Sequence, residues 1–147
     1  WKQSPDRKPL IIRGARQVGK TWLMKEFGEK YYDKCAYINF DDNSRMTKLF
    51  EEDFDLDRII QGLKIESGVN IEAENTLIIL DEIQETPKAL KALKYFCENA
   101  REYHIISAGS LLGVAIHEGT SFPVGKVDFL DLKPLSFFEF IEAMRRK

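Results

Sequence analysis

A loop of eight residues near the start of the chain most strongly limits what this sequence can fold into. Residues 14–21 read GARQVGKT, a G-x-x-x-x-G-K-T pattern. The apolar run PLIIR, residues 9–13, precedes the loop and predicts a strand. Residues 20–30 follow with apolar side chains at helical spacing, and we expect Gly28 to end that helix. The loop therefore joins a strand directly to a helix, a connection typical of parallel sheets.

The alternation of strand and helix continues along the chain. The apolar spacing predicts strands at 9–13, 35–40, 75–82, 103–110 and 126–132, and helices at 20–30, 45–53, 56–67, 87–102, 111–116 and 135–144. The run LIIL before Asp81 is apolar at every position, as in a strand that is buried on both faces. This pattern favours an α/β fold, in which helices cover both faces of a parallel sheet.

Length, charge and cysteine content set further limits. The 147 residues fit a single domain over 1–147. The chain starts at Trp1 without a methionine and stops at EAMRRK directly after an apolar helical pattern, so we expect the N-terminal fragment of a longer chain. The formal net charge of −2 gives no general attraction to nucleic acid or to an anionic membrane. No apolar stretch approaches the ~20 residues that cross a bilayer. Cys35 and Cys97 are isolated, which favours reduced thiols and a cytoplasmic location.

The loop has the chemistry of a phosphate-binding site. Gly14 and Gly19 permit backbone conformations that a side chain would forbid, so several N–H groups can point inward at the positive end of the following helix. Lys20 would reach the β- and γ-phosphates of a nucleoside triphosphate, and the Thr21 hydroxyl would bind Mg²⁺. The residues that we expect to contact the nucleotide are Gly14, Ala15, Arg16, Gln17, Val18, Gly19, Lys20, Thr21, Trp22 and Ser110.

Two adjacent acids, Asp81 and Glu82, end the strand expected at 75–82. Asp81 is placed to hold the water shell of Mg²⁺ beside Thr21, and Glu82 suits a general base that orients or deprotonates water. We predict Glu82 and Lys20 as catalytic residues and Thr21 and Asp81 as the metal site. A solvated turn residue is the alternative for Glu82. Gln84 could position water or report on the γ-phosphate, or be an amide in a turn.

Five pieces of the sequence carry a resemblance to a known family. They are LIIRGARQVGKT, INFDD, LIILDEIQE, SAGSLLG and FPVGKVDFLDLKPLSFFEF, and they extend from about Lys8 to Ile141. Together they resemble the AAA-superfamily ATPase domain of a group of poorly characterised archaeal and bacterial proteins. The resemblance implies ATP, Mg²⁺ and ATPase activity. It also implies a three-layer P-loop fold with five parallel strands, numbered along the chain, in the order 5-1-4-3-2. Such proteins usually continue into a C-terminal domain of unknown function, sometimes nuclease-like.

The resemblance also assigns a sensor of the γ-phosphate to the polar end of the strand expected at 103–110. This role is open to Ser107 or Ser110, and polarity at the end of a strand is the alternative for either. Ala108 stands where relatives often have threonine, which weakens the assignment.

Two other positions depart from the family pattern. Trp22 stands where relatives often have a second hydroxyl residue that can touch the α-phosphate. Lys126 follows Gly125 where many relatives carry arginine. If that arginine serves as an arginine finger, which stabilises charge on the γ-phosphate, lysine would offer one point charge without the planar fork of arginine. The favoured interpretation of Lys126 is an exposed strand residue. Because a finger is worth ~10³–10⁵ in rate, we expect weak turnover by this chain alone.

The expected function is Mg-dependent ATP binding and hydrolysis, coupled to a conformational change of an attached domain or partner. The alternatives are an ATP switch or scaffold that does not hydrolyse and, less favoured, a small-molecule kinase. The acids Asp81 and Glu82 favour water as the acceptor, and the sequence lacks the N-K-x-D pattern that reads guanine. A nucleic-acid or protein partner and an oligomer remain open.

Overall fold

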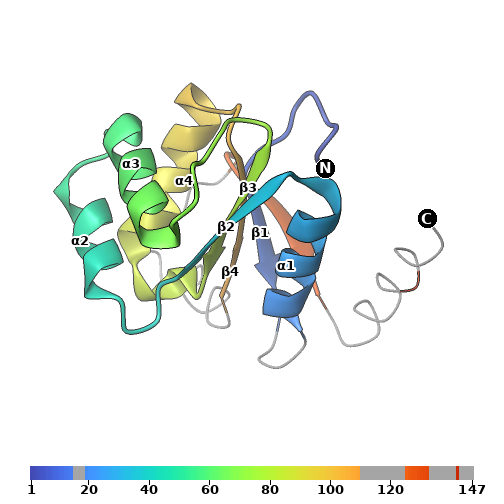
Figure 1. The fold of residues 1–147 in the computed structure, drawn as a ribbon, viewed down its shortest axis with the longest axis horizontal. Helices are drawn as coiled ribbons and strands as arrows, with labels where there is room; N and C mark the ends of the chain where they lie inside the picture. The colour runs from blue at the N-terminus through green and yellow to red at the C-terminus, as the bar shows by residue number, and fades with distance from the viewer. Residues whose placement is uncertain (15–18, 110–124, 133–141, 143–147) are drawn as a thin grey trace.

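The structure, a computed structural model, describes residues 1–14, 19–109, 125–132 and 142 (Figure 1). Its elements are β1 (Leu10–Arg13), α1 (Lys20–Tyr31), β2 (Lys34–Asn39), α2 (Ser44–Glu52), α3 (Leu56–Ser67), β3 (Thr76–Asp81), the 3₁₀ turn η1 (Ile83–Glu85), α4 (Pro87–Asn99), β4 (His104–Ala108) and β5 (Asp128–Asp131). The helix predicted at 111–116 lies outside the described residues, as does that at 135–144 except for Glu142.

The strands form one parallel sheet in the order β2-β3-β4-β1-β5. This is the predicted order 5-1-4-3-2 read from the other edge of the sheet, so the predicted fold is confirmed. β4 lies between β1 and β3, where Ile106 is in register with Leu10 on one side and Ile79 on the other. Because the strands are parallel, their carboxyl ends share one edge of the sheet, and α1 begins at that edge.

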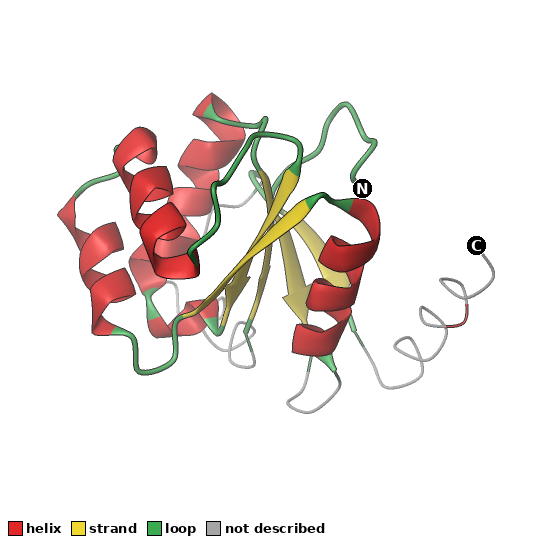
Figure 2. Cartoon of the chain, viewed as in Figure 1, coloured by secondary structure: helices red, strands yellow, loops and turns green. Residues whose placement is uncertain are grey.

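Helices cover both faces of the sheet, with α1 on one and α2, α3 and α4 on the other (Figures 1 and 2). All six residues of β3 are buried, as its apolar sequence predicted. Leu77 and Ile79 belong to the apolar cluster that contains Met24 of α1. Ile78 and Leu80 belong to the cluster on the opposite face. Each of these side chains contributes about 1.5–3 kcal/mol by leaving water.

The expectation that Gly28 ends the first helix is wrong, because α1 continues to Tyr31. A Cβ atom on Gly28 would lie 2.8 Å from Sγ of Cys35 and 3.2 Å from Cδ2 of Leu77. The glycine therefore allows α1 to pack closely against β2 and β3. Gly68 is the glycine that ends a helix, α3, with φ of 71°.

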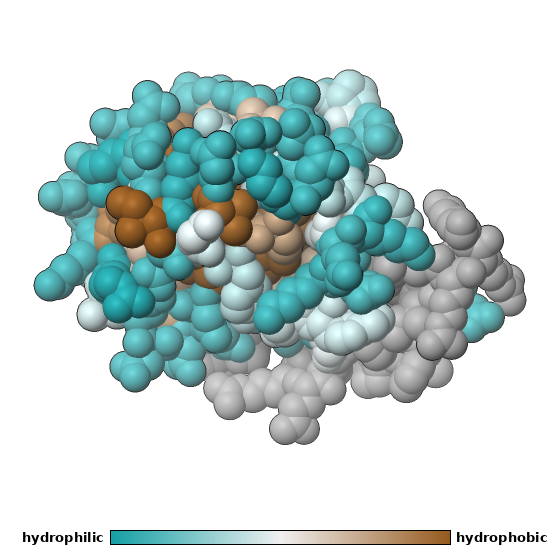
Figure 3. All heavy atoms as spheres, in the orientation of Figure 1, coloured by the Kyte–Doolittle hydropathy of each residue, from teal (hydrophilic) through white to brown (hydrophobic). Residues whose placement is uncertain are grey.

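Most of the surface in Figure 3 is hydrophilic, with a small apolar area on the side of α2 and α3. Ile65 of α3 is 83% exposed and lines a groove between these two helices. Within the described part of the chain, no helix combines the length and the apolar character needed to span a membrane.

His104 is buried at the start of β4, where its Nδ1 lies 2.6 Å from the hydroxyl of Tyr32. The rings of Tyr32 and Trp1 both meet the imidazole edge to face. Burial, together with the nearby charges of Arg7 and Lys2, lowers the pKa of His104 to about 4. The imidazole is therefore neutral in the folded protein at neutral pH.

The stabilising effect of this neutral histidine should depend on pH. The unfolded chain binds a proton near pH 6.5 and the folded chain only near pH 4, so stability is full above pH 6.5 and falls between these values. We expect the stability advantage of the wild type over His104→Gln to shrink by roughly 2–3 kcal/mol from pH 7 to pH 4. Urea unfolding of both proteins across this range measures the difference. A constant difference would show that His104 takes up its proton equally in both states.

Candidate nucleotide site

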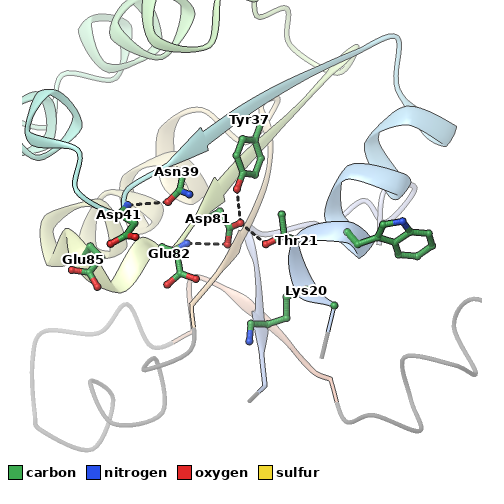
Figure 4. Close-up of a pocket in the computed structure, with 10 residues that line it drawn as sticks. Lys20, Thr21, Tyr37, Asn39, Asp41, Asp81, Glu82 and Glu85 are labelled. Carbon is green, nitrogen blue, oxygen red and sulfur yellow. Dashed lines mark hydrogen bonds between the residues drawn. The ribbon is translucent and has the colours of Figure 1, made fainter. Parts of the chain in front are cut away.

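The carboxyl ends of β2 and β3 and the start of α1 surround a cavity of about 600 Å³ (Figure 4). The described residues that line it are Gly19, Lys20, Thr21, Trp22, Tyr37, Asn39, Asp41, Asp81, Glu82 and Glu85. The cavity therefore brings together the end of the glycine loop and both acids of the predicted pair. Residues 15–18 and Ser110, which were also predicted to contact a nucleotide, lie outside the described residues.

Lys20 connects the two ends of the loop. It is the first residue of α1, and its Nζ donates a hydrogen bond to the carbonyl oxygen of Gly14 at 2.8 Å. Gly19 precedes it with φ of 86°, a left-handed conformation that favours glycine. Lys20 is only 8% exposed. A cation at the positive end of a helix is unfavourable, so an anion bound here would relieve that repulsion.

Asp81 is the centre of the hydrogen-bond network in the cavity. Its Oδ2 accepts from the hydroxyls of Thr21 and Tyr37, both at 2.6 Å, and Figure 4 shows these side chains pointing toward it from α1 and β2. Its Oδ1 accepts from the backbone N–H of Glu82 at 3.0 Å. These three bonds use most of the roughly four lone-pair positions of a carboxylate, which leaves one on Oδ1.

The oxygen atoms of Thr21 and Asp81 are suited to bind Mg²⁺ that is also bound by the phosphates of a nucleotide. The hydroxyl proton of Thr21 is directed at Asp81, so the lone pairs of its oxygen are available to a cation. Among the described residues, no group of three or more His, Cys, Asp or Glu side chains could hold a metal. Mg²⁺ usually keeps several waters and takes few protein ligands beside substrate phosphates. Thr21 and Asp81 are therefore suited to a metal shared with a ligand.

Glu82 stands at the turn that follows β3, with φ of 55° and ψ of 42°. A left-handed conformation costs a residue other than glycine about 1–2 kcal/mol. Its Oε2 accepts a hydrogen bond from Nε2 of Gln84 at 2.7 Å. The Oε1 atom of Gln84 is buried and has no hydrogen-bond partner within the described structure. Gln84 is not among the described residues that line the cavity, and its side-chain amide also lies 3.5 Å from Oε1 of Glu85.

Sequence reasoning missed Tyr37 and Asn39. Both lie on β2 and point to the same side of the sheet as Asp81, since Asn39 and Asp81 are in register. Burial raises the pKa of Tyr37, and its hydrogen bond to Asp81 raises the pKa further, so the phenol remains a donor. Asn39 Oδ1 accepts from the backbone N–H of Asp41, which holds the turn at the cavity wall. Side chains alternate between the two faces of a strand, so the spacing of Tyr37 and Asn39 on β2 was the signal that could have placed both on one face.

Of the two candidates for a γ-phosphate sensor, Ser107 is described by the structure and Ser110 lies outside the described residues. Ser107 is in register with Leu80 and Ile11, which belong to the cluster on the face away from α1. It is 0% exposed, and its hydroxyl has no partner in the described part of the chain. Ser107 therefore points away from the face that carries Asp81. Ser110 stays a prediction.

Lys126 lies two residues before β5, at the amino edge of the sheet. β5 pairs with β1 from Leu10 and Asp128 at that edge to Arg13 and Asp131 near the loop. The strand spans about 13 Å, which separates Lys126 from the cavity of its own chain. Its Nζ lies 3.7 Å from a carboxylate oxygen of Glu98. Lys126 is therefore a partly exposed residue before the strand, and these contacts do not place it as a finger for this chain's own cavity.

Comparison with known proteins gives one family match. The family model described as AAA domain matches residues 6–141. No curated protein matches the sequence. Among solved structures, AMPPCP-bound DnaA from Aquifex aeolicus is similar with a TM-score of 0.44 and 16% identity, and the match covers 95% of this chain. The chain spans only 45% of that DnaA chain.

Proposed function

The chain belongs to the AAA domain family, and from this membership and the geometry of the cavity we propose that it binds ATP with Mg²⁺ and hydrolyses it. One observation carries the proposal. The hydroxyl of Thr21, at the end of the glycine loop, donates to Asp81 at the end of β3 at 2.6 Å. The phosphate-binding and acidic motifs are thus joined at one wall of the cavity.

The charge of the cavity supports a metal–nucleotide complex over a bare nucleotide. Among the described residues that line it, four are acids and one is a lysine: Asp41, Asp81, Glu82, Glu85 and Lys20. Figure 4 shows Asp41, Glu82 and Glu85 on the same side of the site. A triphosphate alone would be repelled by these carboxylates. Mg²⁺ would supply the positive charge that offsets the phosphates in the ground and transition states.

Each residue has a distinct task in this proposal. The Lys20 ammonium neutralises charge on the β- and γ-phosphates, and the Thr21 oxygen offers a lone pair to the metal. Asp81 holds Thr21, and the remaining position on its Oδ1 would be available to a hydrated Mg²⁺. The backbone N–H groups of residues 14–19 would surround the phosphates at the positive end of α1.

Glu82 acts as the general base. Gln84 donates to Oε2 of the Glu82 carboxylate, which holds this side chain and leaves lone-pair positions that can accept a proton from water. As the water oxygen bonds to the γ-phosphorus, the bond from that phosphorus to the bridging oxygen of ADP breaks. The products are ADP and inorganic phosphate, with the proton on Glu82.

We propose that hydrolysis of this kind serves to move an attached domain or a partner. We also propose that the protein is located in the cytoplasm. The support for this location is that the described Cys35 and Cys97 are free thiols, with no disulfide between them.

The proposed reaction is tested by measuring ADP and inorganic phosphate together in the presence of ATP and Mg²⁺. We expect the two products in a one-to-one ratio without any acceptor, at a low rate for this chain alone. ADP formed with little phosphate, and only when an acceptor is added, would indicate a kinase. Tight ATP binding without formation of ADP or phosphate would indicate a switch that does not hydrolyse ATP.

A further inference from the structure

Tyr37 contributes to the cavity although it belongs to neither sequence motif. Its hydroxyl donates to Oδ2 of Asp81 at 2.6 Å, and the same oxygen accepts the hydroxyl of Thr21 (Figure 4). In the sheet register Tyr37 pairs with Ile79, two positions before Asp81. Only a side chain as long as tyrosine can bring a hydroxyl from this position on β2 to the carboxylate.

The ring of Tyr37 is held from the other side by α1. The ammonium of Lys25 lies 4.0 Å from the centre of the ring. Lys25 follows Thr21 by one helical turn, so the helix that carries the proposed metal ligand also packs against the tyrosine. A cation over an aromatic ring adds a modest attraction at an exposed site. Tyr37 is therefore fixed by β2, by Asp81 and by α1.

We propose that Tyr37 is a positioning residue of the magnesium site, which fixes how the Asp81 carboxylate meets the metal. This inference rests on the proposed function. With Tyr37 in place, both available positions on Oδ2 are filled by hydroxyl donors, and the remaining open position is on Oδ1. Asp81 would then face a bound Mg²⁺ only through Oδ1, and Thr21 would be the residue that offers its oxygen to the metal.

Without the phenol hydroxyl, Oδ2 regains a lone pair. The carboxylate can then rotate or bind the cation directly, and the Thr21 oxygen loses its fixed direction. Partners that orient metal ligands in this way typically contribute 10–100-fold to metal affinity. A hydroxyl that only satisfied a buried carboxylate would contribute to stability and leave the metal dependence of ATP binding unchanged.

The test compares Tyr37→Phe with wild type by calorimetric titration of ATP, first with a chelator and then across a range of Mg²⁺ concentrations. We expect the metal-free affinity to stay within about twofold, because phenylalanine touches no phosphate. The enhancement of ATP affinity by Mg²⁺ should fall by 10-fold or more. Tyr32→Phe is the matched control, since it also removes a buried hydroxyl but lies at the opposite end of α1. It should retain the full enhancement.

A second variant covers the case in which Tyr37→Phe does not fold, as judged by thermal unfolding. Lys25→Ala changes an exposed residue and leaves the hydroxyl in place, and it should reduce the Mg²⁺ enhancement about two- to fivefold. A folded Tyr37→Phe with the wild-type enhancement would overturn the inference and leave the proposed function intact. If the wild type itself binds ATP equally well with and without Mg²⁺, both proposals fail.

Discussion

Replacing Glu82 by glutamine should lower ATP hydrolysis by about 10²–10⁴-fold and leave Mg·ATP binding in place. The amide has the size and hydrogen-bonding capacity of the carboxylate, but it cannot accept a proton from water at neutral pH. Binding should persist because Lys20, Thr21 and Asp81 are untouched. The measurement is steady-state phosphate release beside ATP affinity, in this chain together with whatever partner or domain brings turnover to a measurable rate.

Two controls separate a lost base from a lost charge. Glu85→Gln removes one negative charge from the same cavity and leaves Glu82 in place. We expect it to change the rate of hydrolysis by less than about threefold. Asp81→Asn should give a different defect, because it disturbs the hydrogen bonds of Thr21 and Tyr37 and makes hydrolysis depend on Mg²⁺ concentration. Wild-type turnover by Glu82→Gln would reduce Glu82 to a turn residue.

The fold could be predicted because its signals are local. Each strand is a short apolar run, and the apolar sequence of β3 specifies burial on both faces whatever surrounds it. The strand order was predicted from the family resemblance, and the register of β4 between β1 and β3 agrees with it. Gly28 was misassigned because a glycine near a helix end looks the same whether it caps the helix or packs against a strand.

The site was predicted only where its residues are close in sequence. Lys20 and Thr21 follow from the spacing of the loop, and Asp81 from its place after an apolar strand. The place of Tyr37 in the site depends on how β2 pairs with β3. That register is set by tertiary contacts and cannot be read from the local sequence. The position of Lys126 at the far edge likewise depends on how β5 aligns with β1.

Replacing Lys20 by alanine should abolish ATP binding and leave the fold intact. Alanine keeps the helix propensity at the start of α1, while the charge that meets the β- and γ-phosphates is lost. Lys30→Ala removes a lysine from the last turn of the same helix, and it should bind ATP like wild type. Thermal unfolding checks that both variants are folded, and the emission of Trp22 reports the binding.

Trp22 offers the most direct test that the cavity is the ATP site. The chain has 2 tryptophans, so Trp1→Phe leaves Trp22 as the only indole. Trp22 lines the cavity beside Thr21 and is 47% exposed. Titration of this variant with Mg·ATP should give a saturable change in emission at one ATP per chain, and Lys20→Ala in the same background should remove it. An unchanged emission at ATP concentrations that calorimetry shows to be saturating, or an equal response with Lys20→Ala, would contradict ATP binding in this cavity.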